Sequence, residues 1–196
     1  IVSFGKKAES EMRIKEILTT DTGTQIKINN FNLNFKHLPK HYVINIAGVL
    51  LVIKSLNLNL KNILYKINNF QPTQGRGNSF KISIKNKEHV KIIDDSYNAN
   101  PASMEAALEN IYEIKKTQPK INVVLVIGDM LELGKNTKTF HEKLIPIIAL
   151  IKPRCLITVG KYSNIIAKKL KKYLSCVSFD NVDQLKKEFF FIIKPQ

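Results

Sequence analysis

The stretch DDSYNANP (94–101) places two carboxylates and two amides between an apolar segment and a run with helical spacing. A carboxylate at the end of a strand accepts hydrogen bonds from sugar hydroxyls, as an acidic residue does when it holds a ribose. Asn100 is suited to cap a helix, and Pro101 suits the first helical position, where its missing N–H costs nothing. A capped helix leaves residues 94–98 unexplained, so we expect a binding role for this polar run.

The sequence after residue 79 predicts an α/β sheet, which binds ligands at the carboxyl ends of its strands. Apolar runs alternate with helical patterns, which is typical of a Rossmann-like, parallel (doubly wound) domain. The strands are predicted at 89–94, 121–128, 154–160 and 176–179, and the helices at 101–116, 137–151, 161–173 and 182–191. The continuous apolar run 121–128 predicts a strand that is covered on both faces.

The chain before residue 68 has a different pattern. Alternating apolar and polar residues predict β-structure over the first 36 residues, then a buried helix at 41–55 and a shorter helix at 59–68. The segment 68–79 is rich in Pro, Gly and polar residues, and we place a domain boundary there. Hydrophobic residues make up 44% of the sequence, and no apolar run reaches the roughly 18 residues of a membrane span.

The composition is strongly basic, with a formal net charge of +15. The lysines are spread along the chain, and the denser run at 168–172 is interpreted as the solvated face of a helix. Anionic small-molecule substrates therefore account for the charge better than nucleic acid does, and we do not expect a nucleic-acid partner. Cys155 and Cys176 lie in apolar runs and are expected to be buried free thiols, which fits a reducing cytosol.

Several strings together resemble one family. DDSYNANP and GDMLELG (128–134), with QGRG (74–77) and HYVINIAGVL (41–50) before them, are similar to motifs of the ATP-dependent Mur ligases of peptidoglycan synthesis. The similarity is to the branch that adds D-alanyl-D-alanine to UDP-N-acetylmuramoyl-tripeptide. It implies that residues 1–75 end the family's central ATPase domain, and that 76–196 form most of its Rossmann-like C-terminal domain.

The resemblance also implies an activity and its ligands. In this family ATP phosphorylates the terminal carboxylate of the tripeptide, and the amine of D-Ala-D-Ala then displaces phosphate. ATP with Mg²⁺, the two small-molecule substrates and a bacterial cytoplasmic location follow as expectations. Magnesium would offset the repulsion between ATP and the carboxylate.

Site residues are carried over position by position. Asp95 corresponds to the carboxylate that holds the ATP ribose, Arg76 to the arginine that reaches the nucleotide phosphates, and Asn45 to the second asparagine of the helix motif on the adenine side. Tyr42 departs from the motif, because it stands where the first asparagine is expected. Three further polar residues lie at strand ends that we expect to face the cleft, and we assign them to the substrate side; these are Asn98, Asn100 and Asp129.

A phosphate-binding GxxGKT loop is missing from the sequence. The segment GDMLELGKNT has its second glycine one position too far on and an asparagine at the Ser/Thr position, so it does not replace that loop. The chain also begins without Met and ends at IIKPQ, before the family's last strand and helix. We therefore expect a ligase fragment that is inactive by itself, with a non-catalytic nucleotide- or anion-binding α/β module as the alternative.

The histidines carry less information. His141 follows GDMLELG at the family's spacing, and both a site role and a satisfied core or surface position remain open for it. His37, His41 and His89 show no metal-ligand spacing, and no metal site is expected.

Overall fold

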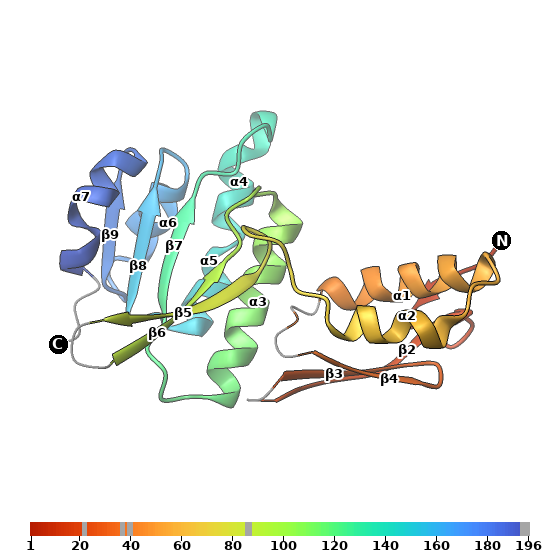
Figure 1. Cartoon of the computed structure of the whole chain (residues 1–196). Coiled ribbons are helices and arrows are strands. Elements are labelled where there is room, and N and C mark those ends of the chain that lie inside the picture. Colours follow the sequence, from red (N-terminus) through yellow and green to blue (C-terminus); the bar gives the residue numbers. More distant parts are fainter. Residues whose placement is uncertain (21–22, 36–37, 39–40, 85–87, 193–196) are drawn as a thin grey trace. The chain divides into compact units, whose positions relative to one another are not determined.

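The structure is a computed structural model, and it divides into two compact units, Ile1–Tyr97 and Asn98–Gln196 (Figure 1). It describes every residue except 21–22, 36–37, 39–40, 85–87 and 193–196. The domain boundary expected between residues 75 and 76 stays a prediction. Within the described residues, no helix is long and apolar enough to cross a membrane.

The first unit contains a four-stranded sheet, two helices and a two-stranded sheet. Its elements are β1 (Phe4–Gly5), β2 (Met12–Thr20), β3 (Gly23–Ile28), β4 (Phe31–Phe35), α1 (His41–Ser55), α2 (Leu60–Asn68), β5 (Asn78–Ile84) and β6 (Glu88–Asp94). The larger sheet has the order β1-β2-β3-β4, with β1 parallel to β2 and the other pairs antiparallel. The predicted early β-structure and both helices are confirmed.

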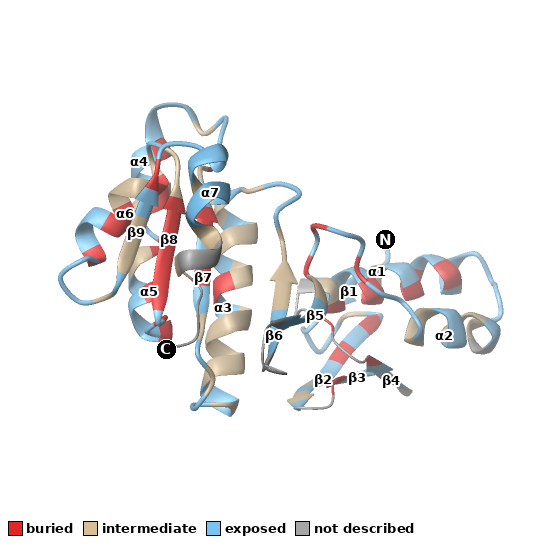
Figure 2. Cartoon of the chain, turned by 60° about the vertical axis from the view of Figure 1, so that its left-hand side comes forward, coloured by how far each residue is buried: buried red, intermediate tan, exposed pale blue. Residues whose placement is uncertain are grey.

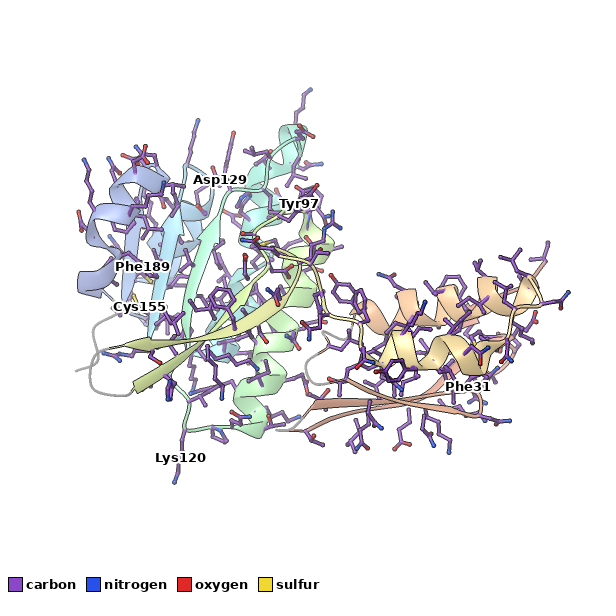
Figure 3. All side chains as sticks on the ribbon, in the orientation of Figure 1. Phe31, Tyr97, Lys120, Asp129, Cys155 and Phe189 are labelled. Carbon is purple, nitrogen blue, oxygen red and sulfur yellow. The ribbon has the colours of Figure 1, made fainter. Side chains whose placement is uncertain are left out.

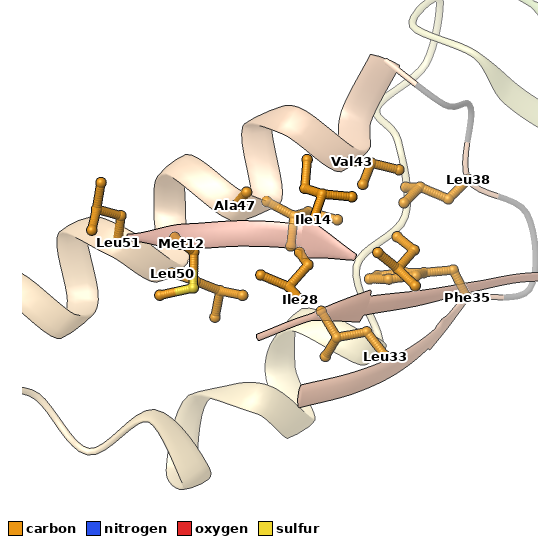
Figure 4. Packing of buried hydrophobic residues seen from close by; sticks show 12 residues of the cluster. Met12, Ile14, Ile28, Leu33, Phe35, Leu38, Val43, Ala47, Leu50 and Leu51 are labelled. Carbon is orange, nitrogen blue, oxygen red and sulfur yellow. The ribbon is translucent and has the colours of Figure 1, made fainter. Parts of the chain in front are cut away.

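The core of this unit lies between the larger sheet and α1 (Figure 4). Residues along β2, β3 and β4 alternate between buried and exposed, as expected for strands with one covered face. The buried residues of the core are Met12, Ile14, Ile26, Ile28, Leu33, Phe35, Leu38, Val43, Ile46, Ala47, Leu50 and Leu51. α2 adds Leu60, Leu64 and Ile67 at the edge of this core.

Helix α1 is apolar on its outer face as well. Ile44, Val49 and Val52, called here the outer face of α1, keep 45%, 51% and 58% of their surface exposed. The expected burial of this helix is therefore confirmed for one side only. An apolar residue on every side is typical of a helix surrounded by other protein.

The prediction that the strand at 89–94 belongs to the parallel sheet is wrong. The segment 89–94 forms a strand, but it pairs antiparallel with β5 in a separate two-stranded sheet rather than joining the parallel sheet. β5 was not predicted, although Phe80 and Ile82 alternate with polar neighbours in it. The register joins Asn78 to Asp94, which brings the start of β5 beside the end of β6.

The second unit is a parallel sheet with helices on both faces. Its elements are α3 (Pro101–Thr117), β7 (Val124–Gly128), the 3-10 turn η1 (Gly134–Asn136), α4 (Thr137–Glu142), α5 (Ile145–Ile151), β8 (Cys155–Val159), α6 (Ser163–Leu170), β9 (Cys176–Phe179) and α7 (Val182–Ile192). The sheet order is β7-β8-β9, and both pairs are parallel. The predicted Rossmann-like α/β class is confirmed for this unit.

Two apolar clusters separate the layers. On one face of the sheet, α3, α5 and α6 pack on β7 and β8 through Leu108, Ile148, Ile166 and their neighbours. On the other face, α7 packs on Cys155, Ile157 and Phe179. β8 is buried along almost all of its length (Figure 2), because helices cover it on both sides.

β7 is less covered than its apolar sequence predicts. Val124 and Val126 alternate with buried residues and keep 38% and 49% of their surface exposed. The helix predicted at 137–151 is also divided, into α4 and α5. Pro146 lies in the first turn of α5, and a proline has no N–H to continue a helical hydrogen-bond ladder.

Candidate functional site

A tight turn at Gly75–Gly77 fixes the position of Arg76. Gly75 and Gly77 have φ of +75° and +76°, a conformation that glycine adopts without steric cost. The Gly77 N–H donates to the Asp94 carbonyl at 2.8 Å, and the Tyr97 N–H donates to the Gly75 carbonyl at 2.9 Å. A Cβ on Gly75 would lie 3.0 Å from the Cβ of Tyr97, so the turn is held closely against the segment that follows β6.

The side chain of Arg76 is exposed and lies over an aromatic ring. Its guanidinium carbon is 4.2 Å from the centre of the Tyr97 ring, whose side chain is labelled in Figure 3. A guanidinium over a ring face is attracted by the ring quadrupole, by about 0.5–1 kcal/mol at an exposed site. A guanidinium binds anions through the N–H groups at the edge of its plane, so a contact over a ring is compatible with anion binding.

Tyr42 connects α1 to the same turn. Its hydroxyl donates to the Arg76 carbonyl at 2.7 Å, and its ring lies 5.6 Å from that of Phe70. Burial raises the pKa of Tyr42, the charge of Asp95 raises it further, and Arg76 opposes the shift. Both predicted nucleotide residues, Arg76 and Asp95, therefore act electrostatically on one hydroxyl. We call Tyr42, Arg76, Asp95 and Tyr97 the arginine cluster.

Asn45 lies one helical turn beyond Tyr42 on α1, and its side chain is exposed. Residues three apart on a helix share a face, so Asn45 is presented on the side of α1 that carries Tyr42. The structure thus brings together Arg76 and Asp95 through Tyr42, with Asn45 on the adjoining turn of the helix.

The two adjacent carboxylates have different surroundings. Oδ1 of Asp94 accepts the Ser96 hydroxyl at 2.6 Å and the Ser96 N–H at 3.2 Å, which closes a local turn after β6. Those bonds give Asp94 a structural role. Asp95 is partly buried within the arginine cluster.

Asn98 and Asn100 belong to the second unit and immediately precede α3. Asn100 accepts the Ser103 N–H at 2.9 Å, and the Ser103 hydroxyl accepts the Asn100 N–H at 3.1 Å. This reciprocal pair is a capping box, and the predicted N-cap is confirmed. Asn98 is exposed, and its Oδ1 accepts the Ala99 N–H at 2.9 Å.

Asp129 follows β7 (Figure 3), and its carboxylate accepts hydrogen bonds from the start of α6. Its oxygens accept the Ser163 N–H at 2.7 Å and the Tyr162 N–H at 3.1 and 3.2 Å, and the side chain is only 16% exposed. A Cβ on Gly160 would lie 2.6 Å from the carboxylate carbon, so a glycine is needed there. Sequence reasoning missed this capping role, because the bonds span 33 and 34 positions.

His141 is fully buried and satisfied. Its Nδ1–H donates to the Thr137 carbonyl at 2.7 Å, and Nε2 accepts the Met130 N–H at 2.9 Å, so the ring is neutral with its proton on Nδ1. Of the interpretations left open by the sequence, the satisfied core histidine is the one observed. The ring fixes the backbone that follows Asp129, whose Oδ1 is 3.9 Å from Nε2.

The other candidate residues are those that could bind a metal ion or react as thiols. In the part of the chain that the structure describes, no three His, Cys, Asp or Glu side chains are grouped to hold a metal ion. Both cysteines are free thiols; Cys155 is buried and Cys176 is partly buried. Burial raises the pKa of the Cys176 thiol, and Cys155 adds to the shift.

Comparisons with known proteins agree with one another. The family model described as "Mur ligase, glutamate ligase domain" matches residues 82–192. The UDP-N-acetylmuramoyl-tripeptide–D-alanyl-D-alanine ligase of Rickettsia prowazekii (strain Madrid E) is 33% identical over 189 residues, which cover 94% of this chain and 40% of that protein.

Solved structures show the same fold. MurF from Acinetobacter baumannii superposes with a TM-score of 0.79 at 20% identity, over 98% of this chain and 41% of that one. MurF ligase from Thermotoga maritima in complex with ADP gives a TM-score of 0.69 at 20% identity, over 97% and 42%. The chain therefore spans about two fifths of the length of these relatives.

Proposed function

This chain belongs to the Mur ligase family, and on that premise we propose that it is part of an ATP-dependent ligase of the bacterial cytoplasm. The ligase would join D-alanyl-D-alanine to UDP-N-acetylmuramoyl-tripeptide during peptidoglycan synthesis. The relative from Rickettsia prowazekii, which carries that name and aligns with 94% of this chain, is the observation that supports this substrate pair.

The proposed reaction has two steps. The tripeptide carboxylate takes the γ-phosphoryl group of ATP, which leaves ADP and an acyl phosphate. The amine of D-Ala-D-Ala then attacks the acyl carbon, loses a proton and expels phosphate as the amide bond forms. Phosphorylation is needed because a free carboxylate is a poor electrophile, whereas phosphate is a good leaving group.

We assign the arginine cluster to the nucleotide. Arg76 would bind phosphate oxygens through its planar N–H groups, and the Asp95 carboxylate would accept hydrogen bonds from the ribose hydroxyls. Asn45, on the neighbouring turn of α1, would lie on the base side. The arrangement of Arg76 and Asp95 around the Tyr42 hydroxyl supports the assignment.

Magnesium is expected to accompany ATP, as the family resemblance implies. The described residues contain no grouping of three or more metal-binding side chains, so we derive no step through Mg²⁺ here. Asn98, Asn100 and Asp129 stay proposals for the substrate side. Each of the three already accepts a backbone N–H through a side-chain oxygen, so a direct contact with substrate would come in addition to these bonds.

A binding role without catalysis is the second candidate for this chain by itself. It is favoured by the missing GxxGKT loop, because no other segment of the sequence offers a cradle for the β- and γ-phosphates. The purified chain should therefore release no phosphate from ATP above a heat-denatured control, with both substrates present.

Nucleotide binding tests the assignment of the two carboxylates. We expect Asp95→Ala to weaken ADP binding roughly tenfold or more, since a hydrogen bond to a charged group contributes about 1.5–3 kcal/mol. Asp94→Ala is the matched control, and it should lower the melting temperature while leaving ADP affinity within about twofold. The reverse pattern, with ADP affinity lost in Asp94→Ala alone, would contradict the assignment.

A chimera tests the ligase activity. This chain would replace the matching two fifths of the Rickettsia prowazekii relative, and phosphate release would be measured with ATP, the tripeptide substrate and D-Ala-D-Ala. We expect release that requires both substrates and is reduced by Asp95→Ala. A chimera that folds and binds ATP but releases no phosphate with all three substrates would count against the proposal.

A further inference from the structure

Two tyrosines contact Arg76 at different points, one at its backbone and one at its guanidinium. We propose that Tyr42 and Tyr97 are positioning residues, which fix Arg76 in the orientation that binds a nucleotide phosphate. This inference rests on the proposed function, because it takes the arginine cluster to be a nucleotide site.

Arg76 needs such restraint because of where it lies. Its side chain is exposed, and it stands between two glycines in the left-handed region. A long, exposed side chain loses conformational freedom when it binds an anion, which weakens binding. Contacts that order the arginine beforehand remove part of that loss.

Tyr97 restrains both the turn and the side chain. Its N–H donates to the Gly75 carbonyl at 2.9 Å, while its ring lies 4.2 Å below the guanidinium carbon. The ring is 67% exposed, so the apolar core does not require it there. The attraction between the ring and the guanidinium favours this position of the side chain over the others that an exposed arginine can adopt.

Tyr42, on α1, restrains the backbone of Arg76. Its hydroxyl donates to the Arg76 carbonyl at 2.7 Å, and this bond joins α1 to the turn across 34 positions of sequence. Burial favours the protonated hydroxyl by raising the pKa of Tyr42, so the donor persists at neutral pH. The two contacts therefore restrain Arg76 at both ends, its carbonyl through Tyr42 and its guanidinium through Tyr97.

The experiment compares two ligands that differ only in phosphate. ADP and adenosine would be titrated into the ¹⁵N-labelled 196-residue chain, and affinities would be taken from chemical-shift changes. The variants are Tyr97→Leu, which removes the ring, Tyr97→Phe, which keeps it, and Tyr42→Phe, which removes only the hydroxyl. The Arg76 Nε–H resonance reports the stacking directly, through the ring-current shift of Tyr97.

We expect Tyr97→Leu to weaken ADP binding about two- to fivefold and Tyr42→Phe about two- to tenfold, with adenosine affinity unchanged in both. Tyr97→Phe should retain both the ring-current shift and the ADP affinity. Equal losses for ADP and adenosine, or full ADP affinity in Tyr97→Leu, would overturn the positioning role alone. Failure of the unchanged chain to bind ADP, or equal binding by Arg76→Ala, would overturn the proposed function and this inference with it.

Discussion

Replacement of Asp129 by alanine should destabilise the second unit, because its carboxylate is the acceptor for two backbone N–H groups at the start of α6. A hydrogen bond to a charged group contributes about 1.5–3 kcal/mol, and loss of a helix cap costs about 0.5–2 kcal/mol. The two estimates overlap, since the same N–H groups enter both, and we expect a loss of about 2–4 kcal/mol. For a unit of this size, each kcal/mol lowers the melting temperature by about 4–8 °C.

The assay is thermal and urea denaturation of the purified chain, followed by circular dichroism. Asp180→Ala is the matched control, because Asp180 follows β9 as Asp129 follows β7 but has an exposed side chain. It should change the stability by no more than about 0.5 kcal/mol. Our interpretation of the carboxylate as a cap is wrong if Asp129→Ala has the same melting temperature as the unchanged chain while the chimera loses its affinity for substrate. In that case the carboxylate binds the substrate.

Three further predictions concern neighbouring features. Gly160→Ala should lower the free energy of unfolding by about 1–3 kcal/mol in the same denaturation assay. Its φ is +114°, and the new Cβ would press on the Asp129 carboxylate. Unchanged stability would contradict this close approach. Asn100→Ala should cost about 1 kcal/mol through loss of the capping box, whereas Glu109→Ala, at an exposed position in the middle of the same helix, should cost much less. The folded-state pKa of Tyr42 lies above its ordinary 10.0, so its contribution to stability is complete below pH 10 and is lost as the pH rises through the folded value. Stability curves of Tyr42→Phe and the unchanged chain should therefore converge in strong alkali, and parallel curves would contradict this.

The sequence predicted an element best where an apolar run of suitable length is clearly bounded by polar residues. α1 spans 41–55 and β9 spans 176–179 as expected, because each is a run of apolar residues bounded by polar ones. β5 was missed, since its alternation is set among lysines and asparagines and its pairing with β6 depends on tertiary contacts. The interruption before α5 could have been anticipated from Pro146.

The candidate site was predictable in its residue types but not in its geometry. Arg76 and Asp95 were found from motifs, and the structure places both near the Tyr42 hydroxyl. The stacking of Arg76 on Tyr97 joins residues whose contact no periodicity reveals. Asp129 was assigned to a ligand because polar groups at strand ends often bind one; that assignment stays a prediction, and the hydrogen bonds that its oxygens accept from the start of α6 were not predicted.

The outer face of α1 bears on how the chain behaves in solution at high concentration. Exposed apolar side chains at 44, 49 and 52 favour contact between molecules, while the net charge of +15 keeps molecules apart. At 0.10–0.15 M salt, repulsion between charges more than about 8–10 Å apart is largely screened, whereas the apolar attraction stays in place. Colloidal stability of this chain should therefore decline as salt is added, the opposite of a protein whose copies associate through charge.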